Sequence, residues 1–83
     1  GGEQMTEELF IKELADILEV EPEAVTMESD FRESADFWSS LTGFAILVFL
    51  EERCGVALDV ETFLKLNTVG DLYAVAMASK EKP

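Results

Sequence analysis

Histidine is absent from the 83-residue chain, and cysteine occurs once, at Cys54. One thiol cannot form a disulfide within the chain, and a structural zinc site needs several cysteine or histidine ligands. A nucleophilic serine or cysteine usually depends on a neighbouring base such as histidine, and no carboxylate pair stands out for acid–base work. We therefore expect no metal site and no enzymatic activity. Cys54 lies on the apolar phase of a predicted helix, which predicts a core thiol.

Basic residues are few: 6 Lys and Arg stand against 18 Asp and Glu, a formal net charge of −12. A surface of this sign repels nucleic-acid phosphates, so binding to nucleic acid is excluded. The same field attracts partners with basic surfaces, at association rates that fall as salt is added. We also expect a monomer.

Long apolar runs are also missing, since the longest, Phe44–Leu50, is far too short to cross a bilayer. The first four residues contain no basic residue of the kind that starts a signal peptide, so a cytoplasmic location is expected. Only 5 glycines and 2 prolines occur, which favours helices over a turn-rich β-sandwich. The length predicts one domain over residues 1–83, with residues 1–5 and 80–83 frayed.

The first predicted helix is Thr6–Val20, with Thr6 as its N-cap and Pro22 ending the pattern. A long connection, 21–39, follows it, with one short turn at 24–27 that turns Val25 inward. A loop of this length in a small domain is usually functional or ordered by its own packing. The core-facing residues of the helix are Phe10, Leu14, Ile17 and Leu18, and the aromatic residues expected to hold the loop to the bundle are Phe31, Phe37 and Trp38.

The second predicted helix is Ser40–Cys54, capped by Ser39 or Ser40 and followed by Gly55 as its C-terminal glycine. Ser39 is the stronger N-cap candidate of the two serines. Helical spacing predicts that Leu41, Phe44, Leu47, Leu50 and Cys54 face the core, and that Ala45, Val48, Phe49 and Glu52 face away. Val48 and Phe49 are therefore candidate exposed apolar residues.

Two further helices complete the chain. Asp59 is the expected N-cap of a short helix at 60–66, and Thr68 is the expected N-cap of the last helix, with Asp71 completing a capping-box arrangement. The buried residues predicted for these helices are Phe63, Leu66, Leu72, Val75 and Ala76. The pattern predicts an all-α four-helix bundle, with three longer helices, one short helix and a long loop between the first two.

At the start of the second helix, Ser39-Ser40-Leu41 resembles the Asp-Ser-Leu motif of the acyl carrier protein family. The apolar helix that follows, ending in Leu-Glu-Glu and a Gly-Val pair, is similar to the family's second helix. The segments 66–72, 23–26 and 29–31 also resemble family landmarks, so the resemblance extends from about Leu9 to Ala78.

The resemblance implies that Ser40 carries 4′-phosphopantetheine, whose thiol holds an acyl group as a thioester. A phosphodiester there meets unpaired N–H groups and the positive end of the helix dipole. It further implies a non-catalytic carrier for type II fatty acid, polyketide or related specialised lipid synthesis. Its partners are then a phosphopantetheinyl transferase and acyl-loading and chain-elongating enzymes with basic docking surfaces. The candidate partner-binding residues are Leu41, Val48, Phe49, Glu51, Glu52, Asp59 and Glu61.

The chain departs from the family pattern beside Ser40. Ser39 replaces the family's aspartate, and the usual acidic positions that follow hold Thr42, Gly43 and Ala45. Two alternatives to an acyl carrier follow. One is an unmodified carrier-like interaction module in which Ser40 only caps the helix, and the other is an amino-acyl carrier (D-alanyl or peptidyl) with the same arm.

Overall fold

The computed structural model describes the backbone of residues 5–80 and the side chains of residues 5–78. Its elements are α1 (Glu7–Leu18), a 3₁₀ turn η1 (Pro22–Ala24), α2 (Phe31–Ser34), α3 (Ser40–Cys54), α4 (Val60–Lys65) and α5 (Val69–Lys80). Within the described residues the only β-pairing is an isolated bridge between Asp30 and Thr68. The all-α prediction is confirmed, with three helices of seven or more residues. The short helix α2, inside the long loop, was not predicted.

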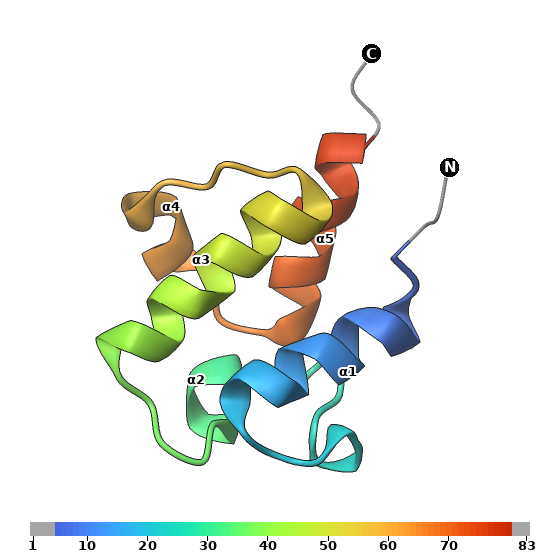
Figure 1. Ribbon diagram of the computed structural model, residues 1–83, viewed down its shortest axis with the longest axis vertical. Coiled ribbons are helices and arrows are strands. Elements are labelled where there is room, and N and C mark those ends of the chain that lie inside the picture. Colours follow the sequence, from blue (N-terminus) through green and yellow to red (C-terminus); the bar gives the residue numbers. More distant parts are fainter. Residues whose placement is uncertain (1–4, 81–83) are drawn as a thin grey trace.

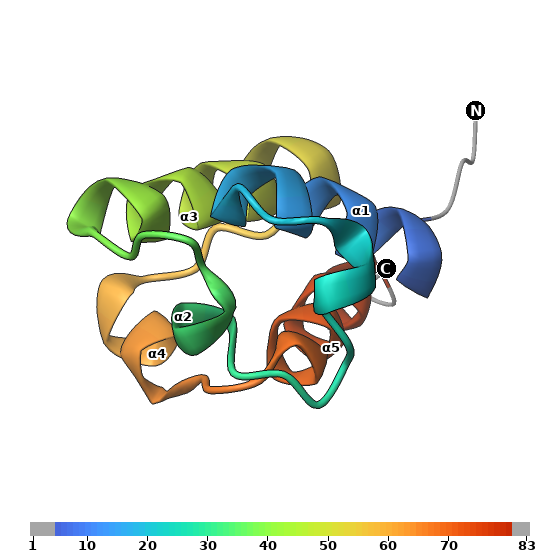
Figure 2. The ribbon, with the colours of Figure 1, turned by 90° about the horizontal axis from the view of Figure 1, so that it is seen from below.

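The helices form two layers around one core. Figure 2 shows α1 and α3 side by side in one layer, with α2, α4 and α5 in the other. The ring of Phe10 in α1 lies 5.4 Å from that of Phe49 in α3 and 5.2 Å from that of Tyr73 in α5. These three aromatic rings therefore join the three long helices at the centre of the bundle. Phe10, Leu14, Leu18, Ile46, Leu50 and Leu72 are fully buried around them.

Local capping sets most helix boundaries. The Thr6 hydroxyl accepts a hydrogen bond from the Leu9 amide at 3.1 Å, and an Asp59 carboxylate oxygen accepts one from the Thr62 amide at 2.9 Å. Both caps are as predicted. Helix α1 stops at Leu18, before the predicted end at Val20, because Glu19 adopts a left-handed conformation with φ of 63°. Gly55 ends α3 in the same conformation, with φ of 74°, which a glycine adopts without strain.

The ends of the chain are partly outside the description. Residues 1–4 and 81–83, which belong to the segments expected to fray, lie outside the described residues. Met5, also assigned to the frayed segment, is instead buried, and its carbonyl accepts a hydrogen bond from the Tyr73 hydroxyl at 3.3 Å. The backbone of helix α5 continues to Lys80, one residue into the segment expected to fray.

The predicted face of α3 is wrong by about one quarter of a helical turn. Leu41 and Phe44, predicted to be buried, are 79% and 64% exposed, whereas Phe49, predicted to face away, is only 6% exposed. The buried residues of α3 are Gly43, Ile46, Phe49, Leu50 and Cys54. A Cβ at Gly43 would lie 3.5 Å from both Trp38 and Phe63, so this glycine faces the interior. Trp38 and Phe63 thus pack on the face of α3 that contains Gly43.

The long loop is held by one buried aromatic residue and one arginine. Phe31 is fully buried, and its ring lies 5.9 Å from Trp38 and 5.6 Å from Phe63. The Arg32 guanidinium donates to the carbonyls of Leu66 at 2.7 Å and Phe63 at 3.2 Å. It also lies 4.6 Å from the centre of the Phe31 ring, within cation–π range. These contacts fasten α2 to α4 and to the turn that follows α4.

Other predictions for the loop have mixed outcomes. Phe31 and the half-buried Trp38 hold the loop as predicted, but Phe37 is 74% exposed and does not. The predicted turn at 24–27 lies slightly earlier, at Pro22–Ala24, and Val25 is buried as expected. Ile17, Leu66 and Val75 are half-buried rather than fully buried.

The N-terminus of α5 contains the capping box predicted from Thr68 and Asp71. The Thr68 and Asn67 amides donate to one Asp71 carboxylate oxygen at 3.0 and 2.9 Å, and the Asp71 amide donates to the Thr68 hydroxyl at 3.1 Å. The hydrogen bonds from Thr68 and then Asn67 stabilise the ionised form, so the pKa of Asp71 lies below its ordinary value of 3.8.

This capping box predicts a specific loss of stability in acid. A carboxyl whose pKa is lowered on folding contributes stability above its unfolded pKa, and that stability is lost as the pH falls through its folded pKa. We expect NMR titration to give Asp71 a pKa below 3.8. Asp71→Asn keeps an accepting oxygen but has no charge to lose. As the pH falls from the unfolded to the folded pKa of Asp71, its free energy of unfolding should therefore fall less steeply than that of the wild type. An unshifted Asp71 pKa would contradict the prediction.

Candidate functional site

The two serines at the start of α3 have different environments. Ser39 is the N-cap, with extended backbone (φ −147°, ψ 174°), and its hydroxyl accepts a hydrogen bond from the Thr42 amide at 3.4 Å. In return the Thr42 hydroxyl accepts a hydrogen bond from the Ser39 amide at 3.3 Å, which completes a capping box. Ser40 is the first helical residue and is exposed. Capping is therefore done by Ser39, and the Ser40 hydroxyl is left facing solvent.

The position of Ser40 suits a phosphate group. Helix α3 has 15 residues, and its first turn presents backbone N–H groups and the positive end of the helix dipole. A phosphate ester on the first helical residue is stabilised by both. The first turn contains no acidic side chain that would repel a phosphate.

The start of α3 is held in place by packing beneath it. Trp38, directly before the cap, packs against the buried Phe31, and Trp38 and Phe63 both lie beside Gly43 in the first turns of the helix. In Figures 1 and 2 the first turn of α3 lies at one edge of the molecule, away from α1 and α5. Ser40 is thus accessible to a large partner while its backbone is fixed by a packed aromatic cluster.

The predicted partner-binding residues do not all lie on one surface. Glu51 and Glu52 are exposed on α3, and Asp59 and Glu61 are exposed at the start of α4. Leu41 is exposed and Val48 is half-buried. Phe49 is a correction: it is buried against Phe10 and is not available as a contact for a partner.

Two exposed aromatic residues beside Ser40 were not predicted as partner contacts. Phe37 precedes the cap and Phe44 lies one turn after Ser40, and both are well exposed. The sequence contains no signal for Phe44, which helical spacing assigned to the core. In the structure Gly43 faces the core, and its neighbour Phe44 is rotated about 100° from it around the helix.

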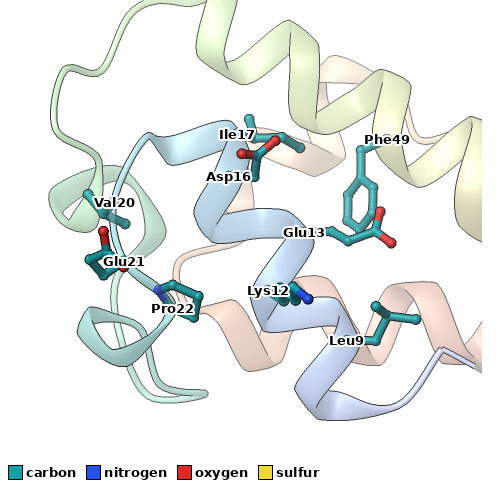
Figure 3. Close-up of a pocket in the computed structure, with 9 residues that line it drawn as sticks. All are labelled: Leu9, Lys12, Glu13, Asp16, Ile17, Val20, Glu21, Pro22 and Phe49. Carbon is teal, nitrogen blue, oxygen red and sulfur yellow. The ribbon is translucent and has the colours of Figure 1, made fainter.

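An open groove lies away from Ser40. It is lined by α1, by the residues that directly follow α1, and by one residue of α3. Its volume is about 630 Å³. Figure 3 shows its lining residues, which are Leu9, Lys12, Glu13, Asp16, Ile17, Val20, Glu21, Pro22 and Phe49. Phe49 lies nine residues after Ser40, roughly 13 Å along the helix axis. The Glu13 side chain at this groove is paired with Arg53 at 2.7 Å. The groove therefore belongs to the α1–α3 contact and not to the surface around Ser40.

The cap itself gives a testable result. Replacing Ser39 with alanine removes the acceptor for the Thr42 amide, and loss of such a cap costs about 0.5–2 kcal/mol of stability. Urea denaturation followed by circular dichroism measures this difference. Ser39→Asp is the matched control, since aspartate is an equally good N-cap and should retain the stability. A destabilised Ser39→Asp together with an unaffected Ser39→Ala would contradict the capping role.

Neither a metal centre nor a membrane span is found in the part of the chain that the structure describes. No group of three or more potential ligands among the described residues is arranged to hold a metal ion. No described helix is long and apolar enough to cross a bilayer. Cys54 is buried at the end of α3, consistent with a core thiol.

Comparison with known proteins assigns the family. Residues 8–76 match the family described as "Phosphopantetheine attachment site". A meromycolate extension acyl carrier protein of Mycolicibacterium smegmatis is 36% identical over 81 residues, covering 93% of this chain and 81% of the relative. An acyl carrier protein of Rhodococcus erythropolis is 37% identical over 73 residues, covering 83% and 79%. No solved structure is significantly similar. The chain therefore belongs to the acyl carrier protein family, whose members are non-catalytic carriers with a phosphopantetheine cofactor.

Proposed function

We propose that this protein holds acyl intermediates as thioesters on a 4′-phosphopantetheine arm at Ser40. It would pass them between enzymes of type II fatty acid, polyketide or related specialised lipid synthesis. The observation that carries the proposal is the division of roles between the two serines. Ser39 is occupied by the helix cap, whereas Ser40 is exposed at the N-terminus of a 15-residue helix.

The residues of the chain supply attachment and positioning. Ser40 offers the hydroxyl that becomes the phosphodiester, and the N–H groups of the first turn of α3 stabilise its negative charge. The arm, when attached, supplies a thiol that carries the acyl group. Trp38 and Gly43 fix the start of α3, so the arm emerges from a defined point at the edge of the bundle.

The names of the relatives, and not the geometry, support a proposal for the cargo. The relatives from Mycolicibacterium smegmatis and Mycobacterium tuberculosis are named for meromycolate extension, and the second is 33% identical over 82 residues. We infer that fatty acyl chains are the cargo of this chain, in preference to amino acids. The form of the protein that already carries the arm should be loaded by a fatty-acid-activating enzyme and not by a D-alanine- or amino-acid-activating enzyme.

The partners are a phosphopantetheinyl transferase and the enzymes that load and elongate the acyl chain. The exposed acids Glu51 and Glu52 on α3, with Asp59 and Glu61 at the start of α4, would meet basic side chains of these enzymes. The net charge of −12 supports attraction of such partners over distance.

The first experiment is a measurement of intact mass. The whole protein is incubated with coenzyme A and a phosphopantetheinyl transferase of broad specificity, and its mass is recorded before and after. A gain of one phosphopantetheine, located on the peptide that contains Ser40, is expected. No gain with several transferases would overturn the proposal and leave the unmodified interaction module as the alternative.

A further inference from the structure

The surface around Ser40 is apolar. Leu41, the residue after Ser40, is 79% exposed, and Phe44, four residues after it, is 64% exposed. Phe37, three residues before Ser40, is 74% exposed. These three are among the few large apolar side chains that the described structure leaves exposed. We call them the serine-side patch.

Helix geometry places Ser40 within this patch. Ser40 and Phe44 are four residues apart in α3, and Leu41 and Phe44 are three apart, so each pair lies on neighbouring turns of one face. Phe37 is tied to the same turn, because its carbonyl accepts a hydrogen bond from the Thr42 hydroxyl at 3.3 Å. An enzyme that reaches the Ser40 hydroxyl must therefore cover the patch.

Charge is sparse around the patch. The exposed Asp36 directly precedes Phe37, and the Arg32 guanidinium lies 5.8 Å from the centre of the Trp38 ring. Residues 37–50 contain no charged side chain, although 29% of the chain is charged. The first acids on the outer face of α3 are Glu51 and Glu52, and Glu51 lies roughly 16 Å along the axis from Ser40. This separation exceeds the Debye length of about 8 Å at physiological ionic strength, so charges there contribute little at Ser40.

The net charge also limits what covers the patch. Two copies of a chain with a charge of −12 repel each other, which disfavours a dimer formed through these residues. An anionic lipid surface is disfavoured for the same reason. The patch fits a protein partner that has an apolar groove beside its active site. The basic groups of such a partner would lie farther away, opposite Glu51 and Glu52 on α3.

We propose that the phosphopantetheinyl transferase docks on this protein chiefly through the serine-side patch, with Leu41 and Phe44 inserted into an apolar groove, and not through charge pairs beside Ser40. This inference rests on the proposed attachment at Ser40. Large side chains at the centre of an interface contribute most of its affinity. Leu41 and Phe44 lie within about one helical turn of Ser40, so they would be at the centre of the interface with the transferase.

The experiment measures the rate of arm attachment to the full chain by a phosphopantetheinyl transferase with coenzyme A. The substrates are the wild type, Leu41→Ala, Phe44→Ala and Phe44→Glu. The matched control is Ala74→Glu, which adds the same charge at an exposed position of α5. Urea denaturation confirms that each variant folds, as expected for changes at exposed positions. Sedimentation of the wild type gives the oligomeric state.

Leu41→Ala and Phe44→Ala should each lower kcat/KM for attachment about 10-fold. Phe44→Glu should lower it further, and Ala74→Glu should leave it unchanged. Salt should lower kcat/KM of the wild type and of the alanine variants alike, through the long-range attraction of the net charge. The fold-loss of each alanine variant should therefore be the same at about 50 and about 500 mM salt. The protein should sediment as a monomer.

Three results would overturn the inference while leaving the proposed function intact. They are an unchanged rate in both alanine variants, a Phe44→Glu variant that reacts as fast as the wild type or faster, and a dimer that Phe44→Glu dissociates. A wild type that gains no arm with any transferase would instead remove the proposed function, and this inference with it.

Discussion

Replacing Ser40 with alanine is expected to abolish attachment of phosphopantetheine, whereas replacing Ser39 with alanine leaves attachment intact. Ser40 is exposed and directly precedes Leu41, as the attachment serine does in the family motif. Ser39 is half-buried, and its hydroxyl is engaged with the Thr42 amide. The neighbouring serine is therefore a matched control with the same hydroxyl chemistry in a different environment.

The measurement is the intact mass of each variant after incubation with coenzyme A and transferase. The wild type and Ser39→Ala should gain one arm, and Ser40→Ala should gain none. Because Ser40 does not provide the cap, its replacement should leave the urea midpoint close to that of the wild type, so loss of the arm is not explained by unfolding. Attachment that survives Ser40→Ala, or that is lost only in Ser39→Ala, would contradict the assignment.

The starts of the helices were predictable because their causes are local. Thr6, Ser39, Asp59 and Thr68 all act as N-caps or in a capping box, and each accepts from an amide three residues later. Such interactions depend on a few consecutive residues, which a sequence displays directly. The extra helix α2 was missed because it has only four residues, and its position depends on contacts of Arg32 with residues more than thirty positions away.

The face of α3 was not predictable from hydrophobic spacing. Between Leu41 and Leu50 nearly every residue is apolar or small, so several faces satisfy the helical period equally well. Tertiary contacts decide the rotation of α3: Trp38 and Phe63 pack beside Gly43, and Phe49 packs on Phe10. As a result the motif pointed to Ser40, while two of the three exposed apolar residues around it, Leu41 and Phe44, were predicted to face the core.

Replacing Phe31 with alanine is expected to cost about 3–5 kcal/mol of stability, the range for a fully buried phenylalanine. At roughly 0.05–0.15 kcal/mol per residue, a domain of this size has a total stability of about 4–12 kcal/mol, so the variant should be close to unfolding. The loss is large because Phe31 supports Trp38, Phe63 and Arg32 together. Urea denaturation followed by circular dichroism measures it.

Phe37→Ala is the matched control, since Phe37 belongs to the same loop but is 74% exposed. Its stability should change by no more than about 0.5 kcal/mol, as for other surface substitutions. Equal losses in the two variants would contradict the assignment of Phe31 as the residue that fastens the loop. Trp38 directly precedes the N-cap of α3 and packs on Phe31. Phe31→Ala should therefore also loosen the start of this helix. Hydrogen exchange at the amides of the first turn of α3 should then accelerate more than in α5, which links the packing of the loop to the presentation of Ser40.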